Sequence, residues 1–270
     1  MPIIHAIVLG LVQGLSEFIP ISSSGHLQLV PWLFGWDDFA GRPELERSFD
    51  VALHLGTLAG AIAYFRRDIV RYVRAGFTEP SSTDGRIAWL LVLSAVPAAI
   101  VGALLSDFFT DLAEAEWVIG VLLIVFGLVL LWADRLRGDR RREDFTLRDA
   151  LLVGAAQSLA LTPGVSRSGV TITTARRLGF DRDAAARLSF LMSLPIIAGA
   201  LLYEGADLVG DFPPGFGPAF AWGIAASAVS GWVAVWATLR VVRAHTFAPF
   251  VVYRVVVGVA VLVIAASSFR

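Results

Sequence analysis

The stretch QGLSEFIPISSSGH, residues 13–26, determines the predicted fold. It interrupts an apolar run from Ile3 to Phe34 with a proline, three consecutive serines and a glycine. Each half of that run is shorter than the roughly 20 residues with which a helix crosses about 30 Å of hydrocarbon. Non-helical backbone at membrane depth is tolerated only where it lines a cavity or is buried in protein. We therefore predict a re-entrant helix–break–helix hairpin over residues 3–34.

A second broken segment, residues 147–178, repeats the first. Its interruption reads PGVSRSG, residues 163–169, and the two segments match at a shift of 144 residues. The matched pairs are Gly10 with Gly154, Gln13 with Gln157, Leu15 with Leu159, Ser22 with Ser166, Ser24 with Ser168, and Gly25 with Gly169. This self-similarity predicts an internal repeat with units 1–134 and 147–270.

The composition is that of a membrane protein. Of the 270 residues, 56% are hydrophobic and 17% are charged, whereas soluble domains average about 45–50% and about 25%. Six further stretches are long and apolar enough to approach a full membrane span: Phe49–Phe65, Ile87–Leu105, Trp117–Ala133, Leu188–Tyr203, Pro218–Leu239 and Phe247–Phe269. Each unit then holds one hairpin and three spans. Because three is odd, the second unit must be inverted, and we predict a single all-α membrane domain, residues 1–270, with an inverted-topology repeat.

The residue types present limit the chemistry. The chain has no cysteine, and all 22 of its basic residues are arginine, so thiolate metal sites, thiol nucleophiles and lysine Schiff bases are excluded. A formal net charge of −1 argues against a nucleic-acid partner. Catalysis must therefore use Arg, His, Glu, Asp, Ser or Thr.

The arginine distribution predicts the orientation. If residues 66–86 lie inside the cell, the six spans place residues 135–148, 176–187 and 240–243 inside too, and these four segments hold 17 of the arginines. The opposite side has Arg42, Arg47 and Arg270. Because short cytoplasmic loops carry the basic excess, we expect the first hairpin to enter from outside and the second from the cytoplasm.

The two breaks carry the candidate site. A helix restarts after each proline, beside Ser22 and Ser166, and its N-terminus presents unpaired N–H groups and partial positive charge. Two such N-termini meeting from opposite leaflets would bind an anion, for which phosphate is the natural candidate, and Arg167 adds a fork of donors suited to phosphate oxygens.

The positions at which the two copies differ suggest catalysis. Glu17, Ser23 and His26 correspond to Leu161, Arg167 and Val170, so one copy supplies an acid and a base and the other a cation. Ionisable side chains at membrane depth are costly, which favours a functional reason for them.

Structural explanations compete for the same residues. A serine run is typical of a flexible turn, His26 could be an interior histidine, and Glu17 with Arg167 could be a structural ion pair. His54 is an ambiguous candidate for lining the site. For Arg254 we expect a structural role, with its side chain extending to the cytoplasmic face.

These two signatures, QGLSEFIPISSSGH (13–26) and PGVSRSGVT (163–171), resemble those of the undecaprenyl-diphosphate phosphatases linked to bacitracin resistance. The resemblance covers essentially the whole chain. It implies a helical, often dimeric membrane protein that hydrolyses a polyprenyl diphosphate lipid to its monophosphate. It further implies phosphate release on the outer side of the bacterial plasma membrane and a required divalent cation, Mg²⁺ or Ca²⁺.

The resemblance also implies roles for individual residues. Glu17 would be the essential carboxylate and a metal ligand, Ser23 the nucleophile or a substrate-holding hydroxyl, His26 the acid/base and Arg167 the diphosphate clamp. Further substrate-binding residues would be Gln13, Ser22, Ser24, Gly25, Gly164, Ser166, Ser168 and Thr171. Many relatives have a second glutamate where this chain has Gln13, which makes a two-carboxylate metal site less secure.

One mechanistic hypothesis is that His26, polarised by Glu17, activates Ser23 for in-line attack on the terminal phosphorus. Attack by water or by His26 itself is the competing mechanism.

A transporter or flippase for a lipid-linked or small phosphate anion is the alternative function, because inverted repeats and broken helices are common in transporters. The element Ser24-Gly25-His26 also resembles a motif of the type-2 phosphatidic acid phosphatases. The first motif of that family contains lysine, which this chain lacks.

Overall fold

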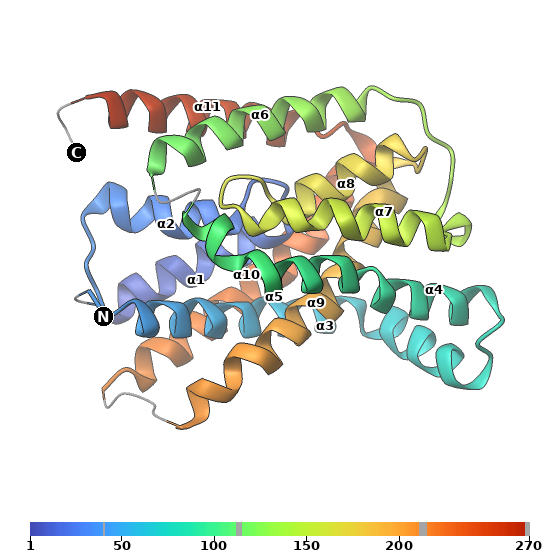
Figure 1. Cartoon of the computed structure of the whole chain (residues 1–270), viewed down its shortest axis with the longest axis horizontal. Helices are drawn as coiled ribbons and strands as arrows, with labels where there is room; N and C mark the ends of the chain where they lie inside the picture. The colour runs from blue at the N-terminus through green and yellow to red at the C-terminus, as the bar shows by residue number, and fades with distance from the viewer. Residues whose placement is uncertain (40, 112–114, 211–214, 268–270) are drawn as a thin grey trace.

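Helices form every element in the part of the chain that the computed structural model describes, residues 1–39, 41–111, 115–210 and 215–267 (Figure 1). They are α1 (Ile3–Phe18), α2 (Ser23–Phe34), α3 (Pro43–Thr78), α4 (Thr83–Leu93), α5 (Ala95–Asp111), α6 (Glu116–Asp134), the short helix η1 (Arg142–Asp144), α7 (Leu147–Gln157), the short helix η2 (Ser158–Leu161), α8 (Arg167–Arg177), α9 (Arg182–Gly210), α10 (Gly217–Ala244) and α11 (Ala248–Ala266). An all-α fold is thus confirmed.

The six predicted spans are confirmed by length and composition. They lie in Pro43–Thr78, Thr83–Leu105, Glu116–Asp134, Arg182–Tyr203, Gly217–Ala244 and Ala248–Ala266. The second span differs from the prediction because α4 ends at Leu93 and α5 begins at Ala95. Pro97 explains the interruption, since proline has no N–H to donate and its ring excludes the carbonyl group four residues earlier. Residues 268–270, with the end of the last predicted span and Arg270, lie outside the described residues.

Both broken segments consist of two helices joined by a break. The first break lies between Phe18 and Ser23, and the second lies between Leu161 and Arg167. The residues before the new helices, Ser22 and Ser166, have φ angles of 78° and 76° and are the described non-glycine residues with positive φ. These are the two serines that the sequence repeat matches. Such strained backbone persists only where surrounding contacts hold it, and it is concentrated at functional sites.

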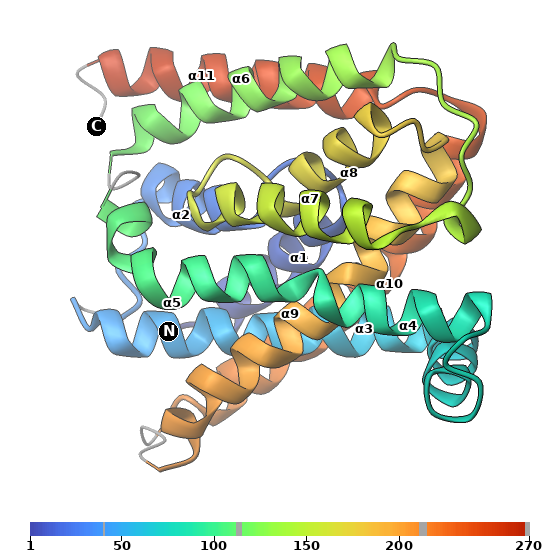
Figure 2. The same ribbon diagram turned by 45° about the vertical axis from the view of Figure 1, so that its right-hand side comes forward.

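The broken helices lie between two groups of helices. In Figures 1 and 2, α1, α2, α7 and α8 run between the α6–α11 pair and the helices α3, α4 and α5. Close packing of α1 on α10 needs glycine: a Cβ on Gly14 would lie 2.0 Å from the Oγ of Ser230, and one on Gly10 would lie 2.4 Å from the carbonyl oxygen of Gly223. Small residues let helices approach closely in membranes. This packing buries the face of α1 that carries Gln13 and Glu17.

The arginine-rich segments gather at one end of the protein. Asp68 pairs with Arg71 at 3.2 Å, with Arg142 at 3.7 Å and with Arg187 at 4.0 Å, which joins three of the four segments. The fourth joins them through Arg243, which is 2.7 Å from Asp183. In Figure 1 the α3–α4 and α6–α7 connections lie opposite the two chain ends. The position of all four segments at one end agrees with the arginine-based prediction. That this end faces the cytoplasm stays a prediction.

Candidate active site

The two breaks contact each other inside the helical bundle. The backbone N–H of Gly164 donates to Ser22 Oγ at 2.9 Å, and Ser168 Oγ donates to the carbonyl oxygen of Ile19 at 3.3 Å. Glycine makes this approach possible, because a Cβ on Gly25 would lie 3.2 Å from the backbone nitrogen of Gly164. Two segments about 140 residues apart in the sequence therefore build one site.

Arg254 on α11 holds both breaks in place. Its side chain is fully buried, and it donates to the carbonyl oxygens of Pro20 at 3.2 Å, Gly164 at 2.9 Å and Val165 at 3.2 Å. Its Nε also donates to the carbonyl oxygen of Leu123 at 2.9 Å. The prediction that Arg254 extends to the cytoplasmic face is wrong. The breaks leave carbonyl groups without helical donors, and the guanidinium, with five N–H donors, satisfies several of them at once.

Replacing Arg254 with methionine should therefore destabilise the protein. The substitution keeps an apolar stem but leaves buried carbonyl groups unpaired, each at a cost of about 1–3 kcal/mol. We expect the free energy of unfolding to fall by about 3 kcal/mol, measured by denaturant unfolding in detergent. Arg177→Met, on the exposed end of α8, is the control and should change little. Equal stability of Arg254→Met and the parent protein would contradict this role.

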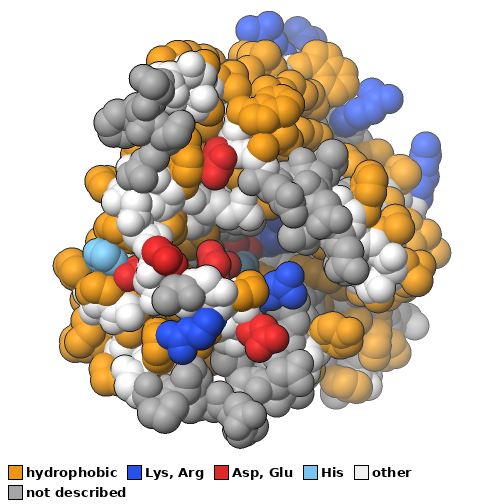
Figure 3. All heavy atoms as spheres, turned by 60° about the vertical axis from the view of Figure 1, so that its left-hand side comes forward, with side chains coloured by type: hydrophobic (Ala, Val, Ile, Leu, Met, Phe, Trp, Pro, Cys, Tyr) orange, Lys and Arg blue, Asp and Glu red, His pale blue; other side chains and the backbone are white. Residues whose placement is uncertain are grey.

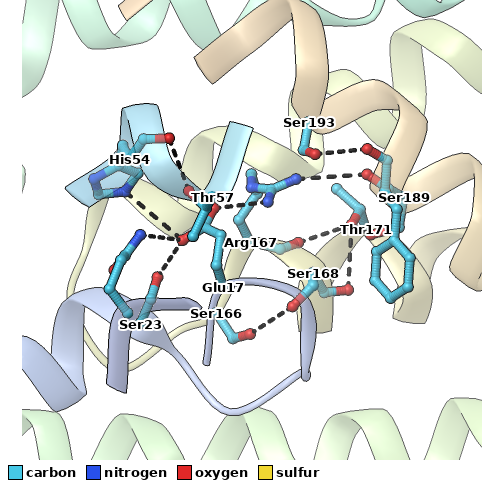
Figure 4. Close-up of polar contacts among 12 residues, drawn as sticks. Glu17, Ser23, His54, Thr57, Ser166, Arg167, Ser168, Thr171, Ser189 and Ser193 are labelled. Atoms are coloured by element: carbon cyan, nitrogen blue, oxygen red, sulfur yellow. Dashed lines mark hydrogen bonds and ion pairs between the residues drawn. The ribbon is translucent and has the colours of Figure 1, made fainter. Parts of the chain in front are cut away.

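Glu17 is the centre of the site. Its side chain is 5% exposed, and its Oε1 accepts a hydrogen bond from Arg167 Nη2 at 2.8 Å. Its Oε2 accepts from Ser23 Oγ at 2.6 Å and from Gln13 Nε2 at 3.1 Å (Figure 4). The structure thus brings together one residue from each of α1, α2 and α8 that the sequence singled out, with Gln13 as a fourth partner. A buried carboxylate with these partners is held in its ionised form.

His54 is the histidine that faces this carboxylate. Its Nε2 lies 3.7 Å from Glu17 Oε2 (Figure 4). Its Nδ1 is 2.8 Å from the carbonyl oxygen of Asp50. Because a carbonyl can only accept, Nδ1 must carry a proton, and the ring presents Nε2 to the site. The side chain is 33% exposed. The sequence left His54 as an ambiguous candidate, and helix α3 places it at the site.

His26 lies elsewhere in the same region. Its Nδ1 donates to the carbonyl oxygen of Ser22 at 2.7 Å, and its Nε2 is 2.9 Å from the hydroxyl of Tyr253, whose ring stacks on it. Both ring nitrogens are thus engaged by the first break and by α11. The expected contact with Glu17 is not among the contacts of the described residues. Tyr253 was missed from the sequence, because nothing local to α11 marks it as a partner of residue 26.

The other predicted substrate-binding hydroxyls mostly shape the breaks. Ser166 Oγ accepts from the backbone N–H of Gly169 at 3.1 Å and lies 3.3 Å from Ser168 Oγ. Thr171 Oγ1 donates to the carbonyl oxygen of Arg167 at 2.8 Å and lies 2.7 Å from Ser189 Oγ, a partner that the sequence did not indicate. Ser24 is half-buried at the start of α2.

The reactive groups remain accessible although Glu17 is buried. The side chain of Arg167 is 13% exposed and Ser23 is half-buried. Figure 3 shows the face near the chain ends hollowed at its centre, with acidic, basic and histidine side chains at the hollow. An anion entering the site would meet Ser23, Arg167 and His54 before Glu17.

The same residues suit a hard cation only in part. Among the described residues no three His, Cys, Asp or Glu side chains are grouped as a metal site. However, the buried Oε1 of Gln13, beside Glu17, has no hydrogen-bond partner in the part of the chain that the structure describes. One carboxylate and one amide oxygen fit a Mg²⁺ ion that takes its other ligands from water and substrate phosphate, as Mg²⁺ commonly does.

Comparison with known proteins gives a consistent result. Residues 6–260 match the family "Bacitracin resistance protein BacA". A protein of Desulforudis audaxviator named "Undecaprenyl-diphosphatase" is 48% identical over 263 residues, which cover 97% of each chain. Proteins of the same name from Pelotomaculum thermopropionicum and Moorella thermoacetica are 43% and 44% identical, over 99% and 100% of this chain and 98% and 100% of theirs.

Proposed function

The chain belongs to the bacitracin resistance protein BacA family, and from this premise we propose that it hydrolyses undecaprenyl or a related polyprenyl diphosphate to the monophosphate and inorganic phosphate. The observation that carries the proposal is the contact of Glu17 with Ser23 at 2.6 Å and with Arg167 at 2.8 Å. A base, a hydroxyl nucleophile and a cation within one site are the groups that phosphoryl transfer requires.

The geometry supports Glu17 rather than His26 as the base for Ser23. Ser23 Oγ donates its proton to Glu17 Oε2, whereas both nitrogens of His26 have other partners. We propose that Ser23 Oγ attacks the terminal phosphorus as its proton passes to Glu17. The bond from that phosphorus to the bridging oxygen breaks, and polyprenyl monophosphate leaves. Water then attacks the phosphoserine phosphorus and the bond from that phosphorus to Ser23 Oγ breaks. Glu17 returns its proton to Ser23 Oγ, and inorganic phosphate leaves with the oxygen and protons of the water.

Arg167 supplies the charge stabilisation in this proposal. Its Nη2 is bound to Glu17, and its Nη1 contacts the carbonyl oxygen of Ser189 only at 3.5 Å. The weakly held side of the fork is available to equatorial phosphate oxygens, on which charge is spread in the transition state. The N-termini of α2 and α8 add partial positive charge from two directions.

A divalent cation, Mg²⁺ or Ca²⁺, belongs to the proposal as well. Glu17 and Gln13 Oε1 would hold it. When bound, it would neutralise charge on the diphosphate and orient it.

Transport of a phosphate anion or lipid is the alternative, and it is not favoured. The proposed base and the hydroxyl nucleophile occur in one copy of the repeat only, with Leu161 and Arg167 at the positions matching Glu17 and Ser23. Anion passage alone needs no base beside a hydroxyl nucleophile. The curated relatives are also named for a diphosphatase.

We further propose that the protein lies in the bacterial plasma membrane with this site open to the outer side. The arginine-rich end, which holds the four segments joined by Asp68 and Asp183, would face the cytoplasm. The resemblance also implies a dimer, and we propose a homodimer as the oligomeric state to test.

Phosphate release from a purified, detergent-solubilised sample separates the two functions. With a polyprenyl diphosphate and saturating Mg²⁺ or Ca²⁺, we expect steady phosphate release. Absence of release together with lipid or anion flux in proteoliposomes would favour transport instead.

The phosphoserine intermediate can be tested by rapid quench. With substrate labelled at the terminal phosphate, we expect acid-stable label on Ser23, and none in Ser23→Ala. Turnover without any label on the protein would point to direct attack by water.

A further inference from the structure

A polar pocket of about 610 Å³ opens at the arginine-rich end of the protein. Its walls come from the end of α6 and the segment after it, the end of α8, the start of α9 and the end of α10. Small-molecule sites commonly have volumes of about 300–1,000 Å³. No lining residue is shared with the site around Glu17, so this pocket is separate from the proposed active site. Five arginines line it, Arg135, Arg137, Arg176, Arg182 and Arg243, together with three aspartates.

The three carboxylates of the pocket are already engaged. Asp134 accepts from Arg182 Nε at 2.5 Å and from the backbone N–H of Phe247 at 3.0 Å. Asp183 accepts from Arg243 Nε at 2.7 Å, and Asp181 accepts from the backbone N–H of Ala184 at 2.7 Å. They therefore neutralise only part of the positive charge around the pocket.

Two guanidinium groups of the pocket have no carboxylate partner among the described residues. Arg135 and Arg137 are exposed, and neither side chain makes a hydrogen bond or an ion pair in the part of the chain that the structure describes. Each has five N–H donors in a planar fork. Donors of this kind in an electropositive pocket are suited to an anion with several acceptor oxygens.

Hydrogen bonds within the protein hold the wall of the pocket in place. Arg176 is 4% exposed and donates to the carbonyl oxygens of Phe180 at 2.5 Å and Asp134 at 3.2 Å, and also to that of Leu136. These bonds join the segment after α6 to the segment after α8. Gly138 allows the approach, because a Cβ there would lie 2.6 Å from the carbonyl oxygen of Phe180. Since the partners of Arg176 are carbonyl groups, they do not cancel its charge, and its buried Nε has no partner among the described residues.

Tryptophans place the pocket at the depth of lipid headgroups. Trp132 on α6 and Trp236 on α10 are 48% and 44% exposed, and each lies near a pocket residue along its helix. Arginine side chains stand over both indoles, Arg177 at 5.9 Å and Arg240 at 5.8 Å. Tryptophan is enriched at the membrane–water interface. A pocket just beyond these rings is within reach of both the lipid surface and the solution.

We propose that this pocket binds a phosphate group, carried by an anionic lipid headgroup or by a free phosphate ion. A tetrahedral phosphate offers enough oxygens for Arg135 and Arg137 together, and the excess positive charge favours it over neutral ligands. The inference stands on the pocket alone and does not depend on the proposed activity.

Paired variants test the proposal in the full-length protein. Arg135→Gln/Arg137→Gln removes the two unpaired guanidinium groups, and Arg74→Gln/Arg86→Gln removes two exposed arginines elsewhere on the protein, with the same change in net charge. Binding of phosphatidylglycerol is measured in detergent by native mass spectrometry, with phosphatidylcholine for comparison. Binding of inorganic phosphate is measured by calorimetry at constant ionic strength. Unfolding midpoints check that both variants fold.

We expect the Arg135/Arg137 variant to lose at least tenfold in affinity for the phosphate-bearing probe and the Arg74/Arg86 variant to stay within twofold of the parent protein. Selective loss of phosphatidylglycerol assigns the pocket to lipid, whereas selective loss of inorganic phosphate assigns it to the free ion. Equal losses in both variants would mean unspecific charge attraction and would overturn the proposal. So would the absence of both kinds of binding in the parent protein.

Discussion

Arg167→Gln should reduce kcat/KM for phosphate release by about 10³-fold or more, in the range measured when a charge-stabilising arginine is removed from phosphoryl-transfer enzymes. Arg167 is the cation that reaches Glu17, at 2.8 Å, and its other Nη is only weakly engaged. Without it the site keeps its base and its hydroxyl but loses the full charge that would meet the phosphate. The measurement is steady-state phosphate release from a polyprenyl diphosphate.

Stability has to be separated from catalysis in this experiment. Removing Arg167 leaves the Glu17 carboxylate buried without its ionic partner, which costs about 3–5 kcal/mol in comparable buried pairs. Glu17→Gln/Arg167→Gln removes both charges, so it should regain most of that stability and stay inactive. Arg167→Lys keeps the charge without the planar fork and should recover only part of the rate. Activity within tenfold of the parent protein in Arg167→Gln would refute the role given to this residue.

Glu17→Gln should lower kcat by about 10²–10⁴-fold, the usual contribution of a general base, and should change KM less. Glutamine has nearly the same shape and still accepts a hydrogen bond from Ser23, but it cannot take the proton. The substitution should therefore slow the chemical step more than it weakens substrate binding. Rapid quench should show no phosphoserine in this variant, because attack by Ser23 precedes the labelled intermediate.

The matched control is Glu79→Gln, which changes the same charge at an exposed position after α3. It should keep parental kcat and KM. If Glu17→Gln still formed phosphoserine at the parental rate, another group would have to accept the proton of Ser23. His54 would then be the first to test, since its Nε2 is 3.7 Å from Glu17 Oε2.

Much of the architecture could be predicted from the sequence because membrane insertion depends on local properties. A helix in lipid needs about 20 apolar residues, so length and hydropathy are sufficient to locate the six spans. Proline, glycine and serine likewise marked both breaks, and their repetition at a shift of 144 residues indicated that they belong together. The contact between Gly164 and Ser22 agrees with that expectation.

The partners within the site could not be predicted in the same way. Glu17, Ser23 and Arg167 were singled out because the repeat differs at these positions, and the structure joins them. Of the two histidines considered for the site, His26 and His54, His26 was predicted to be the acid/base. Which histidine faces the carboxylate depends on the rotation of α2 and α3 about their axes. The structure turns His54 toward Glu17 and His26 toward Tyr253.

Local apolar length and helix-breaking residues thus determined that this chain is an all-α membrane protein with two interrupted helices, and its two signatures indicated the family. Tertiary packing alone decided that Arg254 points inward to the carbonyl groups of both breaks and that His54 lies beside Glu17. The physical reason is that hydropathy is a property of each segment by itself. A buried polar side chain takes its partners from whichever helices close packing brings next to it, and those helices are distant in the sequence.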